Sequence, residues 1–145
     1  MTLLETLIVT VLLSAFVIGG NAIWAALNRH LQVLANRASV NREMRAARAL
    51  ILSDMAAASS LAVGQPGVLS LHYSNPALPT VTYSFSQGTL VRTVAAGNQA
   101  ISAAQYLKSA NCALAEDGSL SASWNFQKGT ASATLKIFQV FVNRS

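Results

Sequence analysis

Charged side chains are scarce in this chain. Asp, Glu, Lys and Arg make up 10% of its 145 residues, against about 25% in an average soluble domain. Acids are the rarer kind, with 5 Asp and Glu against 10 Lys and Arg and a formal net charge of +5. Uncharged Ser, Thr, Asn and Gln must cover the surface instead, and such a surface suits a protein that packs against copies of itself.

The patterns that mark an active site are also missing. The sequence contains no Gly-rich phosphate loop, nucleophile elbow or paired-carboxylate pattern. Glu43 and Asp54 are expected to pair with nearby arginines, and Glu116-Asp117-Gly118 is a turn that lacks the further oxygen ligands of a calcium loop. The sequence therefore predicts a structural or binding protein rather than an enzyme, with no cofactor.

Cysteine and histidine are too few for a disulfide framework or a metal centre. Cys112 is the one cysteine, so it cannot form an intrachain disulfide and is expected to act as a small buried hydrophobe. His30 and His72 have no Cys, Asp or Glu at ligand spacing. No metal site is therefore predicted.

Proline is absent before Pro66, and helix-forming residues dominate the segment that precedes it. Apolar residues recur there at spacings of three and four between Leu27 and Ile51, the period of one helix face. The pattern predicts one long helix over residues 2–62, apolar in its first half and amphipathic in its second.

Two adjacent glycines, Gly19 and Gly20, lie inside this predicted helix. Together they cost about 2 kcal/mol of helix propensity relative to alanine, so any local unwinding is expected at residues 18–22. The alternative is that the glycines allow neighbouring helices to approach closely, as small residues do in membranes.

The first part of the helix carries almost no charge. No Asp, Glu, Lys or Arg occurs between Thr6 and Asn28, and a helix of that length reaches about 35 Å, enough to cross a bilayer core of about 30 Å. Residues 1–28 are therefore predicted to span a membrane. A cleaved signal peptide is the weaker interpretation, because it would begin with basic residues.

Glu5 is the charged side chain at the start of this apolar run. A carboxylate costs about 2.5–3.5 kcal/mol or more at the bilayer centre, so Glu5 needs a cation. The α-amino group of Met1 in another copy is the natural partner, and such a pair is worth about 4 kcal/mol at an effective dielectric of 20, less a desolvation cost. A plain single-pass anchor would explain the hydrophobicity but not Glu5.

Met1-Thr2-Leu3-Leu4-Glu5, followed by an unbroken apolar helix, resembles the mature N-terminus of type IV pilins and pseudopilins. Thr2 and Glu5 match that pattern residue for residue. The resemblance implies a leader removed before Met1 by a prepilin peptidase, N-methylation of Met1, and residence in the bacterial inner membrane. It further implies that an assembly platform adds the chain to a helical filament with other pilins. Major pilins usually carry a proline where this chain has Ala22.

Five arginines form a basic stretch on the second half of the predicted helix: Arg29, Arg37, Arg42, Arg45 and Arg48. The simplest interpretation is anchoring at the membrane surface and pairing with anionic lipid or neighbouring subunits. Binding of DNA is the alternative, since basic residues clustered on one element are typical of nucleic-acid interfaces.

Residues 63–145 change to the period of β-strands and predict an antiparallel sheet as a globular head. Strands are expected at residues 68–73, 81–85, 89–94, 111–114, 119–126 and 131–142, with a short helix or loop at 100–107. Val81, Tyr83 and Phe85 should share one face of a hairpin and meet Leu90 or Val91 and Val94. The last strand has apolar residues on both faces, so it should be a central or interface strand.

Two segments, Arg45–Met55 and Val81–Arg92, resemble the heads of J-type and W-type minor pilins. The sequence as a whole predicts an α+β, pilin-like fold with three parts: a membrane or filament-core helix (1–28), its amphipathic continuation (29–62) and the sheet head (63–145). The predicted function is that of a structural subunit of a type IV pilus or pseudopilus.

Two alternatives to that function stay open. The first is a minor pseudopilin of type II secretion or of a competence (DNA-uptake) system. The second is a single-pass membrane protein whose head binds a ligand or DNA. As a subunit of a pilus or as a minor pseudopilin, the chain would leave the inner membrane for a periplasmic or extracellular filament.

Overall fold

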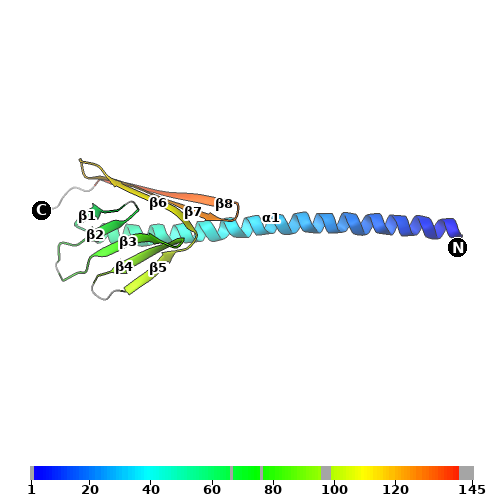
Figure 1. The fold of residues 1–145 in the computed structure, drawn as a ribbon, viewed down its shortest axis with the longest axis horizontal. Coiled ribbons are helices and arrows are strands. Elements are labelled where there is room, and N and C mark those ends of the chain that lie inside the picture. Colours follow the sequence, from blue (N-terminus) through cyan, green and yellow to red (C-terminus); the bar gives the residue numbers. More distant parts are fainter. Residues whose placement is uncertain (1, 66, 76, 96–98, 141–145) are drawn as a thin grey trace. The chain divides into compact units, whose positions relative to one another are not determined.

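The computed structural model describes residues 2–65, 67–75, 77–95 and 99–140. Within them the chain forms one α-helix, α1 (Leu3–Ala57), followed by eight strands (Figure 1). The strands are β1 (Ser60–Val63), β2 (Leu69–His72), β3 (Val81–Ser86), β4 (Thr89–Val94), β5 (Gln99–Ala104), β6 (Leu107–Leu114), β7 (Ser119–Lys128) and β8 (Ala131–Val140). The chain divides into two units, Met1–Ala35 and Asn36–Ser145, called here the N-terminal segment and the head unit. The predicted α+β fold is confirmed.

The described strands form two antiparallel sheets, not the single sheet that the sequence predicts. The first sheet has the order β1-β2-β3-β4-β5 and the second has the order β6-β7-β8. The separation occurs at Tyr106, whose backbone adopts a φ of 64°, a value that is uncommon for any residue except glycine. This bend directs β6 away from β5 and into register with β7.

The helix is shorter than predicted and ends at Ala57 rather than at residue 62. Residues Ser60–Val63 instead form β1, which pairs with Leu69–His72. The backbone N–H of Ser59 donates to the carbonyl oxygen of His72 at 2.9 Å. Ladder pairing with β2 satisfies the backbone groups that a further helical turn would have used, so the head begins before residue 63.

The prediction of a short helix or loop at residues 100–107 is also wrong. Residues Gln99–Ala104 form β5, which pairs with β4, and β6 already begins at Leu107. The expected strand at 111–114 is therefore only the second half of β6. This stretch is rich in Ala, Ser and Gln, so its strand pairing depends on neighbours that are distant in sequence.

The predicted hairpin is confirmed in its register. Val81 lies opposite Val94, and Phe85 lies opposite Leu90. Gln87 and Gly88 connect the strands with φ values of 46° and 77°, the left-handed conformation that tight hairpin turns require.

The last strand, β8, forms an edge of the second sheet, whereas β7 lies in the centre. The central position is therefore wrong for β8, and the alternative of an interface strand stays a prediction. Leu135 and Ile137 are buried, but Phe138 on the opposite face is 76% exposed. The apolar side chain on the outward face is therefore not covered by the single chain. The predicted continuation of the strand through Phe141 and Val142 lies outside the described residues.

The core of the head unit lies between the two sheets and the second half of α1. The helix contributes a buried stripe at the helical period: Val40, Ala47, Ile51 and Met55. The largest fully buried side chains from the strands are Trp124, Tyr83 and Phe126. Cys112 is buried as well, which confirms its predicted role as a core residue.

Candidate functional site

The N-terminal end of α1 is capped by its own side chains. The backbone N–H of Thr2 donates to Glu5 Oε2 at 2.9 Å, and the backbone N–H of Glu5 donates to Thr2 Oγ1 at 3.4 Å. This reciprocal arrangement is a capping box, in which a Thr and a Glu three residues later satisfy two otherwise free helix donors. The spacing Thr-x-x-Glu before an apolar run is the sequence signal of this cap, and the predicted role of Glu5 did not include it.

The cap leaves Glu5 able to accept further hydrogen bonds. An ionised carboxylate has two oxygens with about four acceptor positions, and the cap uses one position on Oε2. Met1 lies outside the described residues, so the predicted pairing of Glu5 with a neighbour's terminal amine, and the predicted methylation of Met1, stay predictions. The two roles of Glu5 are compatible because they use different acceptor positions.

The hydroxyl groups of the N-terminal segment bond to their own backbone. Thr6 Oγ1 donates to the carbonyl oxygen of Leu3 at 2.9 Å, Thr10 Oγ1 to that of Thr6 at 2.7 Å, and Ser14 Oγ to that of Thr10 at 2.8 Å. Hydroxyls bonded in this way need no external partner. The segment therefore presents a surface without free polar groups at these positions.

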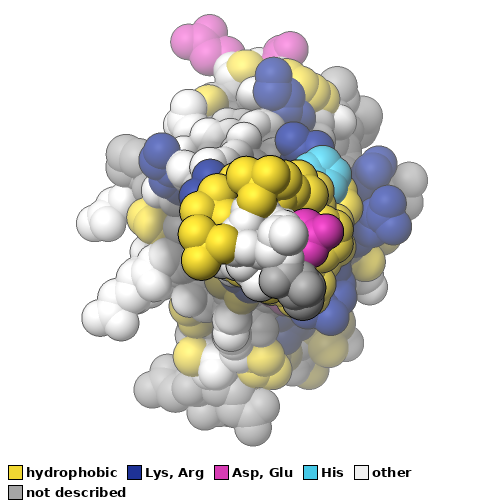
Figure 2. Space-filling view, turned by 90° about the vertical axis from the view of Figure 1, so that its right-hand side faces the viewer, with side chains coloured by type: hydrophobic (Ala, Val, Ile, Leu, Met, Phe, Trp, Pro, Cys, Tyr) yellow, Lys and Arg dark blue, Asp and Glu magenta, His cyan; other side chains and the backbone are white. Residues whose placement is uncertain are grey.

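The N-terminal segment carries exposed apolar side chains around its whole circumference. Every residue from Thr2 to Gln32 is exposed, and Figure 2, which faces this end of the chain, shows a rim of hydrophobic side chains. Within the described residues, one helix is long and apolar enough to cross a membrane. A soluble monomer rarely exposes so large an apolar surface, so this segment has the length and the surface of a helix that could span a membrane.

Gly19 and Gly20 lie within α1, which is unbroken across residues 18–22 in the single chain. A Cβ atom added at either glycine would meet nothing within 4 Å. The chain itself therefore does not require glycine at these positions. Local unwinding and close approach of a second helix both concern the assembled state and stay predictions.

The five predicted basic residues are all exposed. Arg29 lies in the N-terminal segment, and Arg37, Arg42, Arg45 and Arg48 lie on the helix of the head unit. Among these five, Arg37 borders a small described pocket together with residues 130–132. Their predicted contacts with lipid, neighbouring subunits or DNA stay predictions.

The two acids in the second half of the helix, Glu43 and Asp54, bind strands and links of the head rather than helix arginines. Asp54 forms an ion pair with Arg92 of β4, with 2.7 Å between Oδ2 and Nε, and Arg92 Nη2 donates to Oδ1 at 3.2 Å. Glu43 accepts a hydrogen bond at 3.0 Å from the backbone N–H of Gln105. The expected pairing of these acids with nearby arginines is therefore wrong for Glu43, and for Asp54 the partner comes from a strand 38 residues away.

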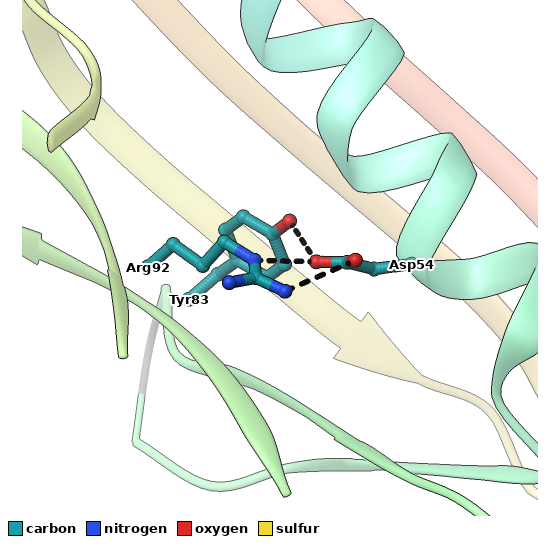
Figure 3. Close-up of polar contacts among 3 residues, drawn as sticks. All are labelled: Asp54, Tyr83 and Arg92. Atoms are coloured by element: carbon teal, nitrogen blue, oxygen red, sulfur yellow. Dashed lines mark hydrogen bonds and ion pairs between the residues drawn. The ribbon is translucent and has the colours of Figure 1, made fainter. Parts of the chain in front are cut away.

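Tyr83 completes this cluster by donating its hydroxyl hydrogen to Asp54 Oδ2 at 2.5 Å (Figure 3). Burial raises the pKa of the Tyr83 phenol, and the hydrogen bond to Asp54 raises it further. The hydrogen bond to Asp54 also raises the pKa of Arg92. The three side chains join the helix to β3 and β4, which is a structural role. Their separation in sequence gave no signal of this contact.

An open groove of about 710 Å³ lies where the two sheets meet. Its lining comes from three turns or links: Gln87, Gly88, Thr89, Gln105, Tyr106, Leu107, Lys108, Gln127 and Gly129. We call it the Tyr106 groove. The described non-glycine residues with positive φ, Gln87 and Tyr106, both line it, and such strained backbone is often found at binding sites.

Hydrogen bonds fix the walls of the Tyr106 groove. The N–H of Leu107 donates to the Gly88 carbonyl at 2.8 Å, and the N–H of Gln127 donates to the Tyr106 carbonyl at 2.7 Å. Lys128 Nζ lies 4.4 Å from the centre of the Tyr106 ring and 2.9 Å from its hydroxyl oxygen. The groove is thus a built feature whose donors include lysine and glutamine side chains.

Among the described residues, no three His, Cys, Asp or Glu side chains gather as a metal-binding group. Comparison with protein-family models, with curated proteins and with solved structures finds no match to this chain. The function is therefore argued from the chain's own residues: the capped apolar helix, the Asp54 cluster and the Tyr106 groove.

Proposed function

We propose that this chain is a structural subunit of a type IV filament, a pilus or a pseudopilus, that polymerises through its N-terminal helix. The observation that carries the proposal is a carboxylate, Glu5, at the tip of a helix whose apolar side chains are exposed from Leu3 to Leu31. Before assembly a bacterial inner membrane would cover this surface. In a filament the same helices of neighbouring copies would cover it.

Glu5 gives such an assembly a defined stagger. Its cap to Thr2 holds the carboxylate at the helix tip, where a neighbour's terminal amine can donate to the acceptor positions that remain. A charge pair of this kind is worth about 4 kcal/mol at an effective dielectric of 20. Apolar packing alone would let the helices slide past one another, because lipid and leucine are equally apolar.

The test separates the charge of Glu5 from its capping role. Glu5→Gln keeps the capping box, since Gln also serves at that position, but it removes the charge. We expect the variant to insert in the membrane normally and to fall at least about tenfold in sheared filaments, equivalent to about 1.4 kcal/mol. The readout is immunoblotting of sheared and membrane fractions from cells that express the full chain.

Thr10→Val is the matched control for this experiment. It removes a hydroxyl that bonds only to the backbone of its own helix, at almost unchanged volume, so its incorporation should equal that of the original chain. Incorporation of the Glu5→Gln variant at the level of this control would reject the proposal.

A further inference from the structure

Most charged side chains of the second sheet lie near its two ends, with Lys136 in the middle of β8 as the exception. Lys108 and Lys128 lie at one end, beside the Tyr106 groove. Glu116 and Asp117 lie in the turn between β6 and β7, and both are exposed. Figure 1 shows this turn at the end of the sheet opposite to the turn that joins β7 and β8. The sheet therefore has a basic end and an acidic end.

Among the described residues of the head unit, the exposed carboxylates are those of the acidic turn, Glu116 and Asp117. The other two acids of the head unit have partners within the chain, since Glu43 accepts the N–H of Gln105 and Asp54 binds Arg92. The N–H of Ser119 donates to Asp117 Oδ1 at 2.9 Å, so the turn has a fixed shape. Hydrogen bonds from Ser119 also lower the pKa of Asp117, which keeps this carboxylate charged.

The Tyr106 groove has the complementary chemistry. Lys108 is exposed in its lining and carries three N–H donors. Gln87 and Gln105, whose side-chain amides are also donors, line the groove as well. A volume of about 710 Å³ lies within the range of about 300–1,000 Å³ found for sites that hold small ligands. The groove therefore has room and donors for two carboxylate side chains.

The turn cannot reach the groove of its own chain. The strand β7 runs from Ser119, beside the acidic turn, to Lys128, beside the groove. Its ten residues separate the two ends by about 33 Å, at about 3.3 Å per residue. Any contact between the two ends must therefore join different copies.

We propose that the acidic turn Glu116–Asp117 of one copy docks in the Tyr106 groove of a second copy. The contact is head-to-tail, and it uses different surfaces on the two partners. Such a contact generates an open filament when its rotation does not close a ring. It rests on the proposed filament function, and it adds a second contact through the head to the contact made by the helices.

The first test is chemical crosslinking in the full chain. In a Cys112→Ala background, Lys108→Cys is combined with Asp117→Cys, and sheared filaments are treated with a short bifunctional maleimide. We expect a ladder of covalent oligomers on a denaturing gel. The matched control combines Asp117→Cys with Lys136→Cys, since Lys136 is exposed in the middle of β8, and this pair should stay monomeric.

The second test is a charge exchange. Glu116→Lys with Asp117→Lys should lower filament incorporation by about fivefold or more, the effect of about 1 kcal/mol for exposed pairs. Adding Lys108→Glu to that double variant should restore part of the loss. Such rescue depends on the two ends meeting, and a merely destabilised head would not show it.

Each other result overturns the proposal in a recognisable way. If the original chain enters filaments but the ladder and the rescue are both missing, head docking is wrong and the filament function stands. If Lys108→Glu alone impairs incorporation and the acidic turn has no effect, the groove binds another anionic partner. If the original chain is missing from sheared filaments, both proposals fail.

Discussion

The two halves of α1 carry apolar side chains of the same kind, but different surroundings cover them. From Thr2 to Gln32 every side chain is exposed. From Val40 to Met55 the helix buries a stripe whose four members are at most 1% exposed. Hydrophobic content is higher in the first half, and yet only the second half belongs to the core of the single chain.

Spacing and partners explain the difference. The second half alternates apolar residues with arginines, so one face packs against the sheets while the other faces solvent. The first half is apolar around its whole circumference, and no single face of a small head could cover it. Within the single chain, no described residues bury this part of the helix. The comparison therefore separates the residues that form the core of the head unit from the apolar residues that the single chain leaves exposed.

The largest expected effect is that of Ile51→Ala, compared with Ile8→Ala in the other half of the helix. Ile51→Ala removes a side chain that is fully buried, and such changes cost about 2–5 kcal/mol. Ile8→Ala truncates a side chain that is 48% exposed in the single chain, so the head should keep its stability. Thermal unfolding of the detergent-solubilised full chain, followed by tryptophan fluorescence, measures both. Equal losses would contradict the division of the helix.

A smaller effect is expected from the Asp54 cluster. Asp54→Asn leaves Arg92 without its anion. The side chain of Arg92 is 19% exposed and that of Asp54 is 14% exposed. We therefore expect the free energy of unfolding to fall by roughly 2 kcal/mol, less than is usual when a fully buried pair is broken. Tyr83→Phe removes one hydrogen bond and should cost about 1 kcal/mol.

Denaturant unfolding of the head measures these two changes. Arg42→Gln is the matched control, because it removes an exposed charge from the same helix and should change stability by no more than about 0.5 kcal/mol. If Asp54→Asn proved as neutral as this control, the cluster would not hold the helix to the sheet.

The last expected effect is a loss of head stability that appears only at alkaline pH. Burial raises the pKa of the Cys112 thiol from about 9 to about 11. The unfolded chain thus loses this proton near pH 9 while the folded head keeps it, so the free energy of unfolding should fall between pH 9 and 11, by at most about 2 kcal/mol. The raised pKa of Tyr83 acts in the same direction.

Chemical denaturation at pH 8, 9, 10 and 11 checks this dependence, and Cys112→Ala should reduce the slope. The N-terminal segment provides an internal comparison, since residues 2–35 contain no Cys, Tyr or Lys. Its helical circular dichroism should therefore not change over the same pH range. A slope that the Cys112→Ala variant leaves unchanged would show that the buried thiol is not its source.

Much of the fold could be predicted because its signals are local. The absence of proline before Pro66 indicated the long helix, and alternating residues with a Gly turn indicated the β3–β4 hairpin in the register observed. The errors fall where pairing is decided at long range. Ser60–Val63 has no strong preference of its own, and it became a strand because β2 lies beside it.

The candidate sites divide in the same way. The capping box of Thr2 and Glu5 depends on residues three apart, so the sequence contained its signal. The Asp54 cluster and the Tyr106 groove join residues from separate strands and turns. No spacing rule connects such residues, and the predicted pairing of the helix acids with helix arginines was wrong for that reason.

The sequence by itself determined that residues 3–31 form an apolar helix with one acid at its tip, because helix period, length and hydrophobicity are properties of consecutive residues. Only the tertiary structure decided which acidic side chains of the head bind partners within the chain and which are exposed. It binds Glu43 and Asp54 to the head and leaves Glu116 and Asp117 exposed at one end of the second sheet. The physical reason is that hydrogen bonds and ion pairs act over a few ångströms in space, whatever the distance along the chain.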